Sequence, residues 1–394
     1  MILGIDAHCI HGDGGSITHL REVLRVVDPA TAGFSRVVLW AGSATLAKIE
    51  DRPWLKKEHV PALDRGLLAR SRWASTKVAG LASAAGCDVL WLPGCSYVGA
   101  FRPFVAMSRN MLPFEWREMR RYGATPRFLR LLFLRYTQAR TYRRADGTIY
   151  LSQYAQSHVG AVVGKSYGDS RVIPHGIAPR FAERDHRRSA TASAETPGRP
   201  VRLLYVSGVD VYKHQWRVIE AVESLQRAGL AVELTLIGPM KPDAEKRFQA
   251  ALRAFGGAPG SVSYLGPLPH ADLHHHYHDA DVFVFASSCE NFPNILLEAM
   301  ASGVAIACSS RGPMPEILKD GGVYFDPENA AEIASAVRQL LQSPALMAEK
   351  GRLAASYSRS YSWARCASET FAYLAEVARR RGTSSSPDPR IQSA

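Results

Sequence analysis

Two acidic residues eight positions apart, Glu290 and Glu298, lie where a buried strand is predicted to give way to a helix. The strand is the apolar run DVFVFA, and the helix should begin near Asn294. The first turn of a helix carries unpaired N–H groups and a partial positive charge, which suit a phosphate group. Glu298 would lie about one turn inside the helix and Glu290 on the loop, each within reach of ligand hydroxyls. Spacing alone favours a plainer interpretation, in which Glu290 is a helix cap or a solvated loop residue and Glu298 is an exposed helix residue.

Alternating apolar runs and helical patterns surround this segment, and such alternation is typical of a parallel sheet. Ligands of such sheets bind beyond the carboxyl ends of the strands. After residue 200, strands are predicted at 201–207, 231–238, 262–265, 281–286, 304–309 and 323–325. Helices are predicted between them at 214–228, 242–255, 270–278, 294–301, 313–319 and 330–342.

The first half repeats the pattern, with predicted strands at 1–6, 36–41, 88–92, 104–108 and 147–152. The 394 residues exceed what one core usually holds, so two domains are expected. The predicted fold class is α/β, with two doubly wound parallel-sheet, Rossmann-like domains facing across a cleft. The expected segments are an N-terminal domain at 1–181, a linker at 182–200, a C-terminal domain at 201–345, helices at 346–381 that could pack back on the N-terminal domain, and a disordered tail at 382–394.

The segment around Glu290 resembles the hallmark of glycosyltransferase family 4, the large retaining family with the GT-B fold. That hallmark is E-x7-E at the start of a helix, followed by EAMA-x-G; here the matching residues are Glu290, Glu298 and EAMASGVAI. The resemblance extends through the C-terminal domain in the correct order. It includes YVSG at 205–208 with Lys213, LIG at 236–238, VSYLG at 262–266, RGPMPE at 311–316 and, before the linker, VIPHGI at 172–177.

The resemblance implies an enzyme that binds a nucleotide-sugar in its C-terminal domain and an acceptor in its N-terminal domain. Departure of the diphosphate would be the difficult step, so positive groups aimed at it should dominate catalysis. Lys213 is the matching cation, Glu298 would bind the ribose, and Glu290 would bind the donor sugar. The other donor-binding positions are Gly15, Gly208 and the helix-start residues Asn294, Ile295 and Leu296.

Three positions depart from the family pattern. Val209 stands where the family often has an arginine, so one of two phosphate cations is missing or is supplied from elsewhere. Phe292-Pro293 occupies a stretch that often holds glycine, so the donor-sugar pocket must differ in shape. His175 replaces the usual asparagine.

The N-terminal half matches less fully. Asp13-Gly14-Gly15 resembles the family's glycine-rich loop after the first strand, although an ordinary turn has the same composition. The segment SRNMLPFE at 108–115 resembles a subgroup of bacterial surface-polysaccharide enzymes. On this resemblance Asn110 would line the catalytic cleft, and Arg109 or Glu115 would contact acceptor or phosphate. A simple ion pair of Glu115 with a nearby arginine is the alternative.

Ten arginines crowd residues 109–144, and the whole chain has a formal net charge of +12. Leucines interleave with them, which is typical either of a membrane-surface helix or of a solvated face on a core helix. The sequence therefore leaves open whether this segment contacts an anionic membrane. No nucleic-acid motif accompanies the charge, so nucleic acid is not an expected partner.

Five histidines crowd residues 270–278, and pairs such as His270 and His274 have the spacing of metal ligands. The segment matches a variable surface helix of the family, which is generally metal-independent, so neither a metal site nor a cofactor is expected. The six cysteines form no C-x-x-C pair and are expected to be reduced, most of them buried. No secretory leader or membrane span is predicted, so a cytoplasmic protein is expected, free or peripheral on the inner face of the membrane.

The favoured function is retaining transfer of a hexose, such as mannose, from an NDP-sugar to a hydroxyl of a glycan or lipid-linked acceptor. The pathway implied is bacterial polysaccharide synthesis, for O-antigen, exopolysaccharide or lipopolysaccharide. A GT-B epimerase or phosphorylase and a non-catalytic nucleotide-sugar-binding protein are the alternatives.

Overall fold

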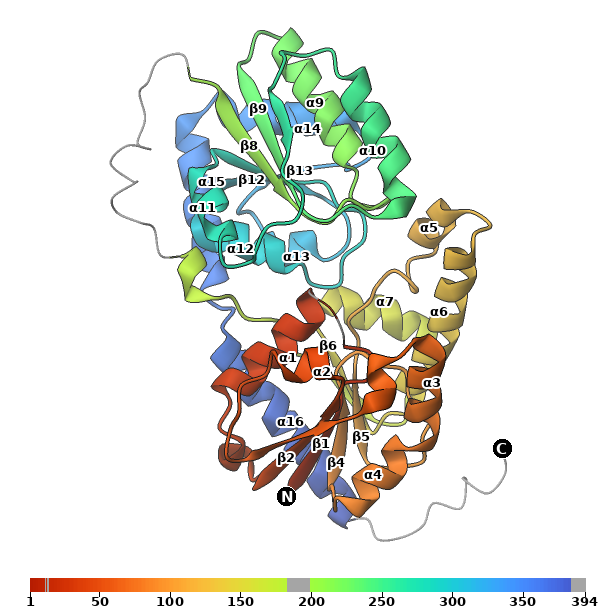
Figure 1. Ribbon diagram of the computed structural model, residues 1–394. Coiled ribbons are helices and arrows are strands. Elements are labelled where there is room, and N and C mark those ends of the chain that lie inside the picture. Colours follow the sequence, from red (N-terminus) through yellow and green to blue (C-terminus); the bar gives the residue numbers. More distant parts are fainter. Residues whose placement is uncertain (11, 13, 183–198, 384–394) are drawn as a thin grey trace. The chain divides into compact units, whose positions relative to one another are not determined.

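The computed structural model describes residues 1–10, 12, 14–182 and 199–383. Most of the expected linker at 182–200, most of the expected tail at 382–394, and Asp13 lie outside the described residues. The chain forms two compact units (Figure 1). The first unit comprises Met1–Asn110, Leu132–Pro174 and the C-terminal segment from Trp363, and the second comprises Met111–Leu131 and His175–Ser362.

The first unit is built on a seven-stranded, all-parallel sheet with the order β3-β2-β1-β4-β5-β6-β7. The inner strands β1, β4 and β5 carry buried side chains on both faces, as expected where helices cover both sides. The strands are β1 (Ile2–Asp6), β2 (Arg36–Ala41), β3 (Leu55–His59), β4 (Val89–Leu92), β5 (Phe104–Met107), β6 (Gly147–Tyr150) and β7 (Asp169–Val172).

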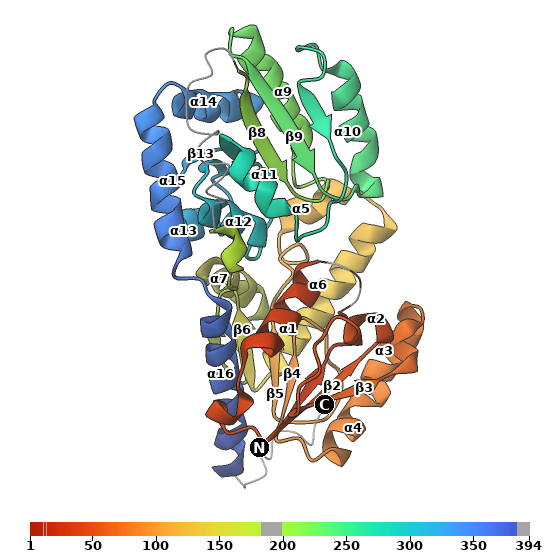
Figure 2. The same cartoon turned by 60° about the vertical axis from the view of Figure 1, so that its left-hand side comes forward.

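The helices of the first unit come from both ends of the chain. The C-terminal helix α16 (Trp363–Thr383) lies alongside α1 (Gly15–Val26) and packs on β4 and β5 (Figure 2). Helix α7 (Gln153–Val163) packs on β6 and β7. The other helices are α2 (Ser43–Leu46), α3 (Leu67–Thr76), α4 (Val78–Ala84) and α6 (Pro126–Arg144), which begins in the second unit, with 3-10 turns η1 (Pro29–Ala32) and η2 (Pro61–Asp64).

The second unit contains a six-stranded parallel sheet with the order β10-β9-β8-β11-β12-β13. Strand order reverses between β8 and β11, as in a doubly wound nucleotide-binding sheet. The strands are β8 (Val201–Val206), β9 (Val232–Ile237), β10 (Val262–Tyr264), β11 (Val282–Phe285), β12 (Ala305–Ser309) and β13 (Val323–Phe325).

Two groups of helices pack on this sheet. Helix α9 contacts α10 and α14, whereas α12 contacts α11 and α15. Their bounds are α9 (Gln215–Arg227), α10 (Pro242–Ala254), α11 (Leu273–Asp279), α12 (Asn294–Ser302), α13 (Met314–Leu318), α14 (Ala330–Leu341) and α15 (Pro344–Ser358). The segment 111–131 adds α5 (Trp116–Met119) and η3 (Arg120–Tyr122), and η4 (Pro179–Phe181) precedes β8.

The structure confirms the predicted α/β class and two doubly wound parallel sheets. All eleven predicted strands are present, but two more, β3 and β7, were missed. Both missed strands lie at the edges of the first sheet and read LKKEH and DSRV. An edge strand is only partly buried, so it lacks the apolar run that marks an inner strand.

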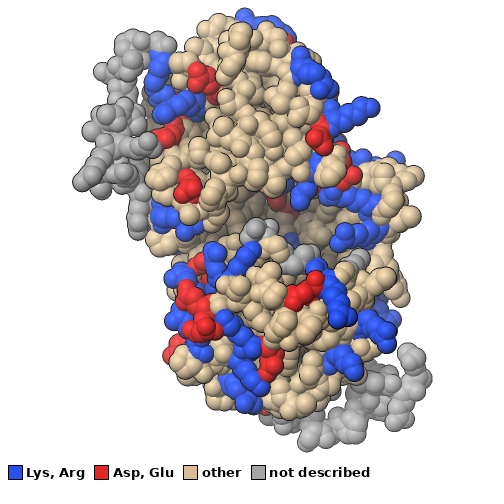
Figure 3. Space-filling model, in the orientation of Figure 1, with Lys and Arg blue, Asp and Glu red and all other residues tan. Residues whose placement is uncertain are grey.

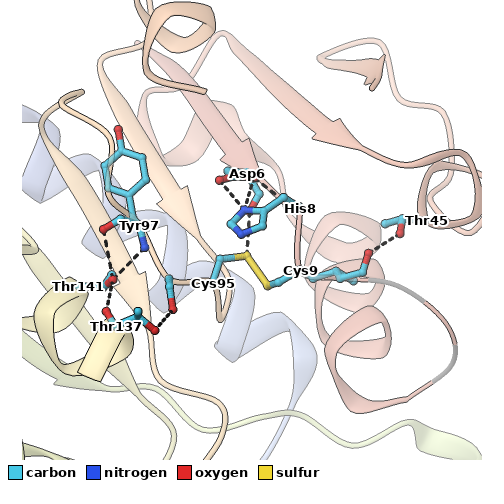
Figure 4. The surroundings of a disulfide bond; sticks show 10 residues. Asp6, His8, Cys9, Thr45, Cys95, Tyr97, Thr137 and Thr141 are labelled. Carbon is cyan, nitrogen blue, oxygen red and sulfur yellow. Dashed lines mark hydrogen bonds and ion pairs between the residues drawn. A yellow bond between two sulfur atoms is a disulfide. The ribbon is translucent and has the colours of Figure 1, made fainter. Parts of the chain in front are cut away.

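The expectation that all six cysteines are reduced is wrong. Cys9 and Cys95 form a disulfide that joins the loop after β1 to the loop after β4 (Figure 4). The two residues are 86 positions apart, so only the fold brings them together. The expectation of burial is confirmed for three of the four free cysteines, Cys289, Cys308 and Cys366.

Candidate active site

The reversal point of the second sheet collects most of the predicted donor-site residues. The chain leaves β8 through residues 207–214, which include Gly208 and Lys213, and it leaves β11 through residues 286–293, which include Glu290. The two loops are hydrogen-bonded, because the Ser288 N–H donates to the Tyr212 carbonyl at 2.9 Å. Loops beyond the strand ends at such a point form the usual ligand crevice of a doubly wound sheet.

Lys213 and Glu290 form an ion pair between these two loops. Their side chains are only 11% and 13% exposed, and the Lys213 ammonium lies 5.2 Å from the centre of the Tyr212 ring. The Tyr205 hydroxyl holds the Lys213 carbonyl at 2.6 Å, which fixes the backbone beneath the cation. A sheltered cation can bind a diphosphate, and the carboxylate beside it can accept hydrogen bonds from nearby hydroxyls of the same ligand.

Gly208 and Gly238 lie where the chain leaves β8 and β9. Gly238 has a φ of 143°, and a Cβ there would lie 2.1 Å from the Ser207 carbonyl oxygen. No larger residue fits without moving the backbone that leads to Gly208. Gln215 donates to the Gly208 carbonyl at 3.1 Å, so the turn is held from the start of α9 as well.

Helix α12 begins at Asn294, as predicted, directly after Pro293. Among the described residues no side chain caps this helix start, and the Asn294 Oδ1 is buried with no partner there. Asn294 and Ile295 are half-buried, whereas Leu296 is fully buried and its N–H donates to the Pro293 carbonyl at 3.1 Å. The first turn therefore offers backbone donors to a ligand and is not sealed in the core.

Phe292 and His175, two departures from the family pattern, contact each other. The Phe292 ring is buried, with its centre 5.7 Å from that of His175 and 5.5 Å from that of Tyr361. Phe292 thus anchors the Glu290 loop to residues far from it in sequence.

Glu298 is 2% exposed, so the plainer interpretation of an exposed helix residue is wrong. Its Oε1 lies 2.7 Å from His270 Nε2, and its Oε2 accepts from the Tyr277 hydroxyl at 3.0 Å. His270 was predicted to begin a helix, but α11 begins at Leu273, because residues 269–272 form a turn closed by the Asp272 N–H on the Pro269 carbonyl. Sequence reasoning missed both partners, although the histidine-rich segment drew attention to one of them.

The segment 111–131 was assigned to the N-terminal domain, yet it packs with the second unit. Glu118 is buried and accepts from the Ser288 hydroxyl at 2.8 Å, two residues from Glu290. Arg121 pairs with both Glu118 and Glu328. This network braces the Glu290 loop, and sequence gave no signal for it.

Three further contacts, made by Tyr122 and Arg127, hold the same segment. The Tyr122 hydroxyl donates to Asp210 at 3.0 Å, and Arg127 pairs with Asp210 and Asp243. Burial, reinforced by the nearby Asp210 charge, raises the pKa of Tyr122. These arginine contacts show that part of the basic stretch is neutralised by acidic side chains from the second unit.

His214 is the last residue of the first loop, and its Nε2 lies 2.9 Å from the hydroxyl of Ser288 in the second loop. Burial, together with the charge of Arg121, lowers the pKa of His214 to about 3, so the ring is neutral at pH 7. Burial also raises the pKa of the Cys289 thiol, and the carboxylates of Glu115 and Glu290 add to the effect. Glu115 belongs to the second unit, and its charge acts on Cys289 in the loop that carries Glu290.

The first unit brings together a smaller set of predicted residues. Arg109 donates from Nη2 to the Gly15 carbonyl at 2.7 Å, at the start of α1. Its Nε and Nη1 are buried and have no hydrogen-bond partner within the part of the chain that the structure describes. Burial lowers the pKa of Arg109 to about 10, but it remains charged at pH 7. Asn110 follows it and is exposed, so Arg109 and Asn110 belong to a different unit from Glu115.

The disulfide lies at the reversal point of the first sheet, between β1 and β4. His8 lies over the Asp6 carboxylate, 2.9 Å from both oxygens, and the Cys95 sulfur is 3.6 Å from the Asp6 carbonyl oxygen (Figure 4). Thr141 and Thr137 of α6 hold the residues that follow Cys95. The disulfide thus links the two loops at the reversal point of the first sheet.

Within the described residues, no three His, Cys, Asp or Glu side chains are grouped so as to hold a metal ion. The same residues include no helix of the length and hydropathy needed to cross a bilayer. On the face drawn in Figure 3, basic and acidic groups are interspersed over both units.

Residues 187–357 match the family described as Glycosyl transferases group 1. This region contains the Lys213–Glu290 pair and helix α12. The matched region lies mostly within the second unit and covers less than half of the chain. The O-antigen chain mannosyltransferase B of Escherichia coli is 32% identical over 115 residues, which cover 29% of this chain and 30% of that one.

Solved structures extend the fold similarity over nearly the whole chain. The sucrose-phosphate synthase of Thermosynechococcus elongatus superposes with a TM-score of 0.72 at 17% identity, covering 98% of this chain and 100% of that one. Anabaena Alr3699/HepE in complex with UDP-glucose gives a TM-score of 0.66 at 17% identity, covering 97% and 99%. The two parallel-sheet units therefore have GT-B glycosyltransferases as structural neighbours. The chain spans 30% to 59% of the length of the first curated relatives that it matches.

Proposed function

We propose that the protein is a retaining glycosyltransferase of family 4 that transfers a hexose from an NDP-sugar to a hydroxyl group. The observation that carries this proposal is the Lys213–Glu290 pair at the β8/β11 reversal point, within the region that matches the group 1 glycosyl transferases. The structural neighbour in complex with UDP-glucose supports a nucleotide-sugar as the donor.

The donor would bind with its diphosphate between Lys213 and the uncapped first turn of α12. Lys213 and the first N–H groups of that turn would stabilise the negative charge that develops as the diphosphate leaves. Glu298 would bind the ribose and Glu290 the donor sugar. This arrangement requires no metal ion for the diphosphate, so activity should survive a chelator.

The acceptor would be a glycan or a lipid-linked glycan of bacterial polysaccharide synthesis. The buried, unsatisfied donors of Arg109 near Gly15 suit an anionic group, and Asn110 is exposed beside them. The similarity to an O-antigen mannosyltransferase supports mannose as the sugar and polysaccharide as the product.

Helix α6 supports peripheral contact with an anionic membrane. Leu129, Phe133 and Tyr136 follow one another at helical spacing and are 65%, 66% and 65% exposed. Arg130 and Arg140 are exposed on the same helix. An apolar stripe flanked by arginines suits the headgroup region of an anionic bilayer, which would place the enzyme on the inner face of the cytoplasmic membrane.

A donor panel tests the proposal. The purified chain would be given UDP-glucose, GDP-mannose and dTDP-sugars in EDTA, with and without lipid-linked acceptors extracted from bacteria. Release of the free NDP that depends on the acceptor is expected for one donor. Isomerised sugar without acceptor would indicate an epimerase, phosphate-dependent turnover a phosphorylase, and binding without turnover a non-catalytic protein.

A further inference from the structure

Glu298 and His270 form a hydrogen-bonded pair that shares no residue with the Lys213–Glu290 pair. Glu298 is almost completely buried in α12, whereas the His270 side chain is 41% exposed. The histidine is therefore the more exposed partner of the pair.

We propose that His270 is a positioning residue, which orients Glu298 toward the ribose hydroxyls of a bound nucleoside diphosphate. The inference rests on the proposed function, since it takes Glu298 as the ribose-binding group. It assigns a role to the histidine-rich segment that requires no metal ion.

The hydrogen-bond partners define the tautomer of His270. Its Nδ1 lies 2.7 Å from Nη2 of Arg180, and a guanidinium can only donate. Nδ1 must therefore accept, and the proton of the neutral ring lies on Nε2, which faces Glu298 Oε1 at 2.7 Å. Arg180 thus sets His270 as a donor to the carboxylate.

Tyr277 orients the second carboxylate oxygen. Its hydroxyl lies 3.0 Å from Glu298 Oε2 and 3.2 Å from the carbonyl of Ile295, in the first turn of α12. Burial and the Glu298 charge raise the pKa of Tyr277, so the hydroxyl keeps its proton. Each carboxylate oxygen then has one donor and can still accept a hydrogen bond from a ribose hydroxyl.

The packing around the pair explains why the histidine is well placed. The Phe181 ring lies 5.5 Å from the His270 ring and 5.7 Å from the Tyr277 ring, centre to centre. His278 Nε2 lies 3.0 Å from the Phe181 carbonyl oxygen, which holds η4 against α11. His270 therefore has one orientation imposed by its ring contact and by both ring nitrogens.

The test compares two ligands on three variants by isothermal titration calorimetry. The ligands are the nucleoside diphosphate that the wild type binds, UDP or GDP, and its 2′,3′-dideoxy analogue. His270→Leu removes the donor, His270→Gln keeps an amide donor, and His275→Leu changes an exposed neighbour as control. Circular dichroism would show that each variant is folded.

His270→Leu should weaken binding of the ribonucleoside diphosphate about 10-fold, as expected for loss of a hydrogen bond to a charged group. It should leave the dideoxy analogue within about 2-fold of wild type, and His270→Gln should recover most of the ribose-dependent affinity. Equal losses for both ligands, or no loss for either, would overturn the positioning role. A wild-type chain that binds neither UDP nor GDP would overturn the proposed function and this inference with it. If the wild type binds, but His270→Leu affects the ribonucleotide and the dideoxy analogue alike, the inference alone would be overturned.

Discussion

Replacing Lys213 with methionine tests the candidate site most informatively, because it removes one charge of a sheltered ion pair. The methionine keeps most of the side-chain volume beside the Tyr212 ring. Glu290 would be left 13% exposed without its partner. Breaking a fully buried pair costs about 3–5 kcal/mol, and this pair keeps some access to water, so about 1–3 kcal/mol of unfolding free energy is expected.

The effect on catalysis should be larger than the effect on stability. A single group that stabilises developing negative charge is worth about 100- to 1,000-fold in rate. Lys213→Met should therefore lower kcat/KM by about that factor, measured as acceptor-dependent NDP release. Lys246→Met, an exposed lysine of α10 in the same unit, is the matched control and should leave both properties unchanged.

The partner variant Glu290→Gln separates phosphate binding from simple structural pairing. It frees Lys213 from its carboxylate, so diphosphate affinity should be kept or increased while sugar transfer falls. In Lys213→Met/Glu290→Gln the unpaired charge is gone, so stability should exceed that of Lys213→Met. If Lys213→Met and Glu290→Gln weakened diphosphate binding equally in calorimetry, the pair would be structural and the assignment of Lys213 would fail.

Three further predictions concern stability. The pKa of His214 is about 3 in the folded protein and about 6.5 in the unfolded chain, so only the unfolded chain gains a proton as the pH falls below 6.5. The free energy of unfolding, measured with urea, should therefore fall by about 2 kcal/mol between pH 7 and pH 5. His214→Asn should reduce this dependence on pH. Reducing the Cys9–Cys95 disulfide opens a loop of 86 residues and should lower the free energy of unfolding by about 2–4 kcal/mol. The variant with serine at both positions should not respond to dithiothreitol. Finding six alkylatable thiols in the untreated protein would contradict the disulfide. Glu118→Gln keeps an acceptor for Ser288 but removes the charge that faces Arg121, so the free energy of unfolding in urea should fall by about 1–3 kcal/mol. An unchanged urea midpoint would show that the Glu118 contacts do not stabilise the fold.

The sequence predicted the elements whose burial is local to one strand or helix. The run VFVF of β11 and the acidic spacing after it are visible without any partner, because an inner parallel strand is apolar on both faces. The edge strands β3 and β7 carry no such mark. Gly208, Glu290 and the start of α12 were found for the same reason: each lies directly beyond a strand that the pattern shows.

Long-range partners could not be predicted. Arg127 lies 83 residues from Asp210 and 116 from Asp243, so the sequence left it equally suited to a membrane face or to solvent. Cys9 and Cys95 are likewise joined only by the adjacency of β1 and β4. The pairing of Glu298 with His270 depends on a turn at 269–272 that helical periodicity does not reveal.

The most direct test of the central claim is a crystal structure of the chain with the nucleoside diphosphate that it binds. We expect diphosphate oxygens within about 3 Å of Lys213 Nζ and of the first N–H groups of α12, with the ribose at Glu298. A nucleotide bound elsewhere, with Lys213 still paired only to Glu290, would contradict it.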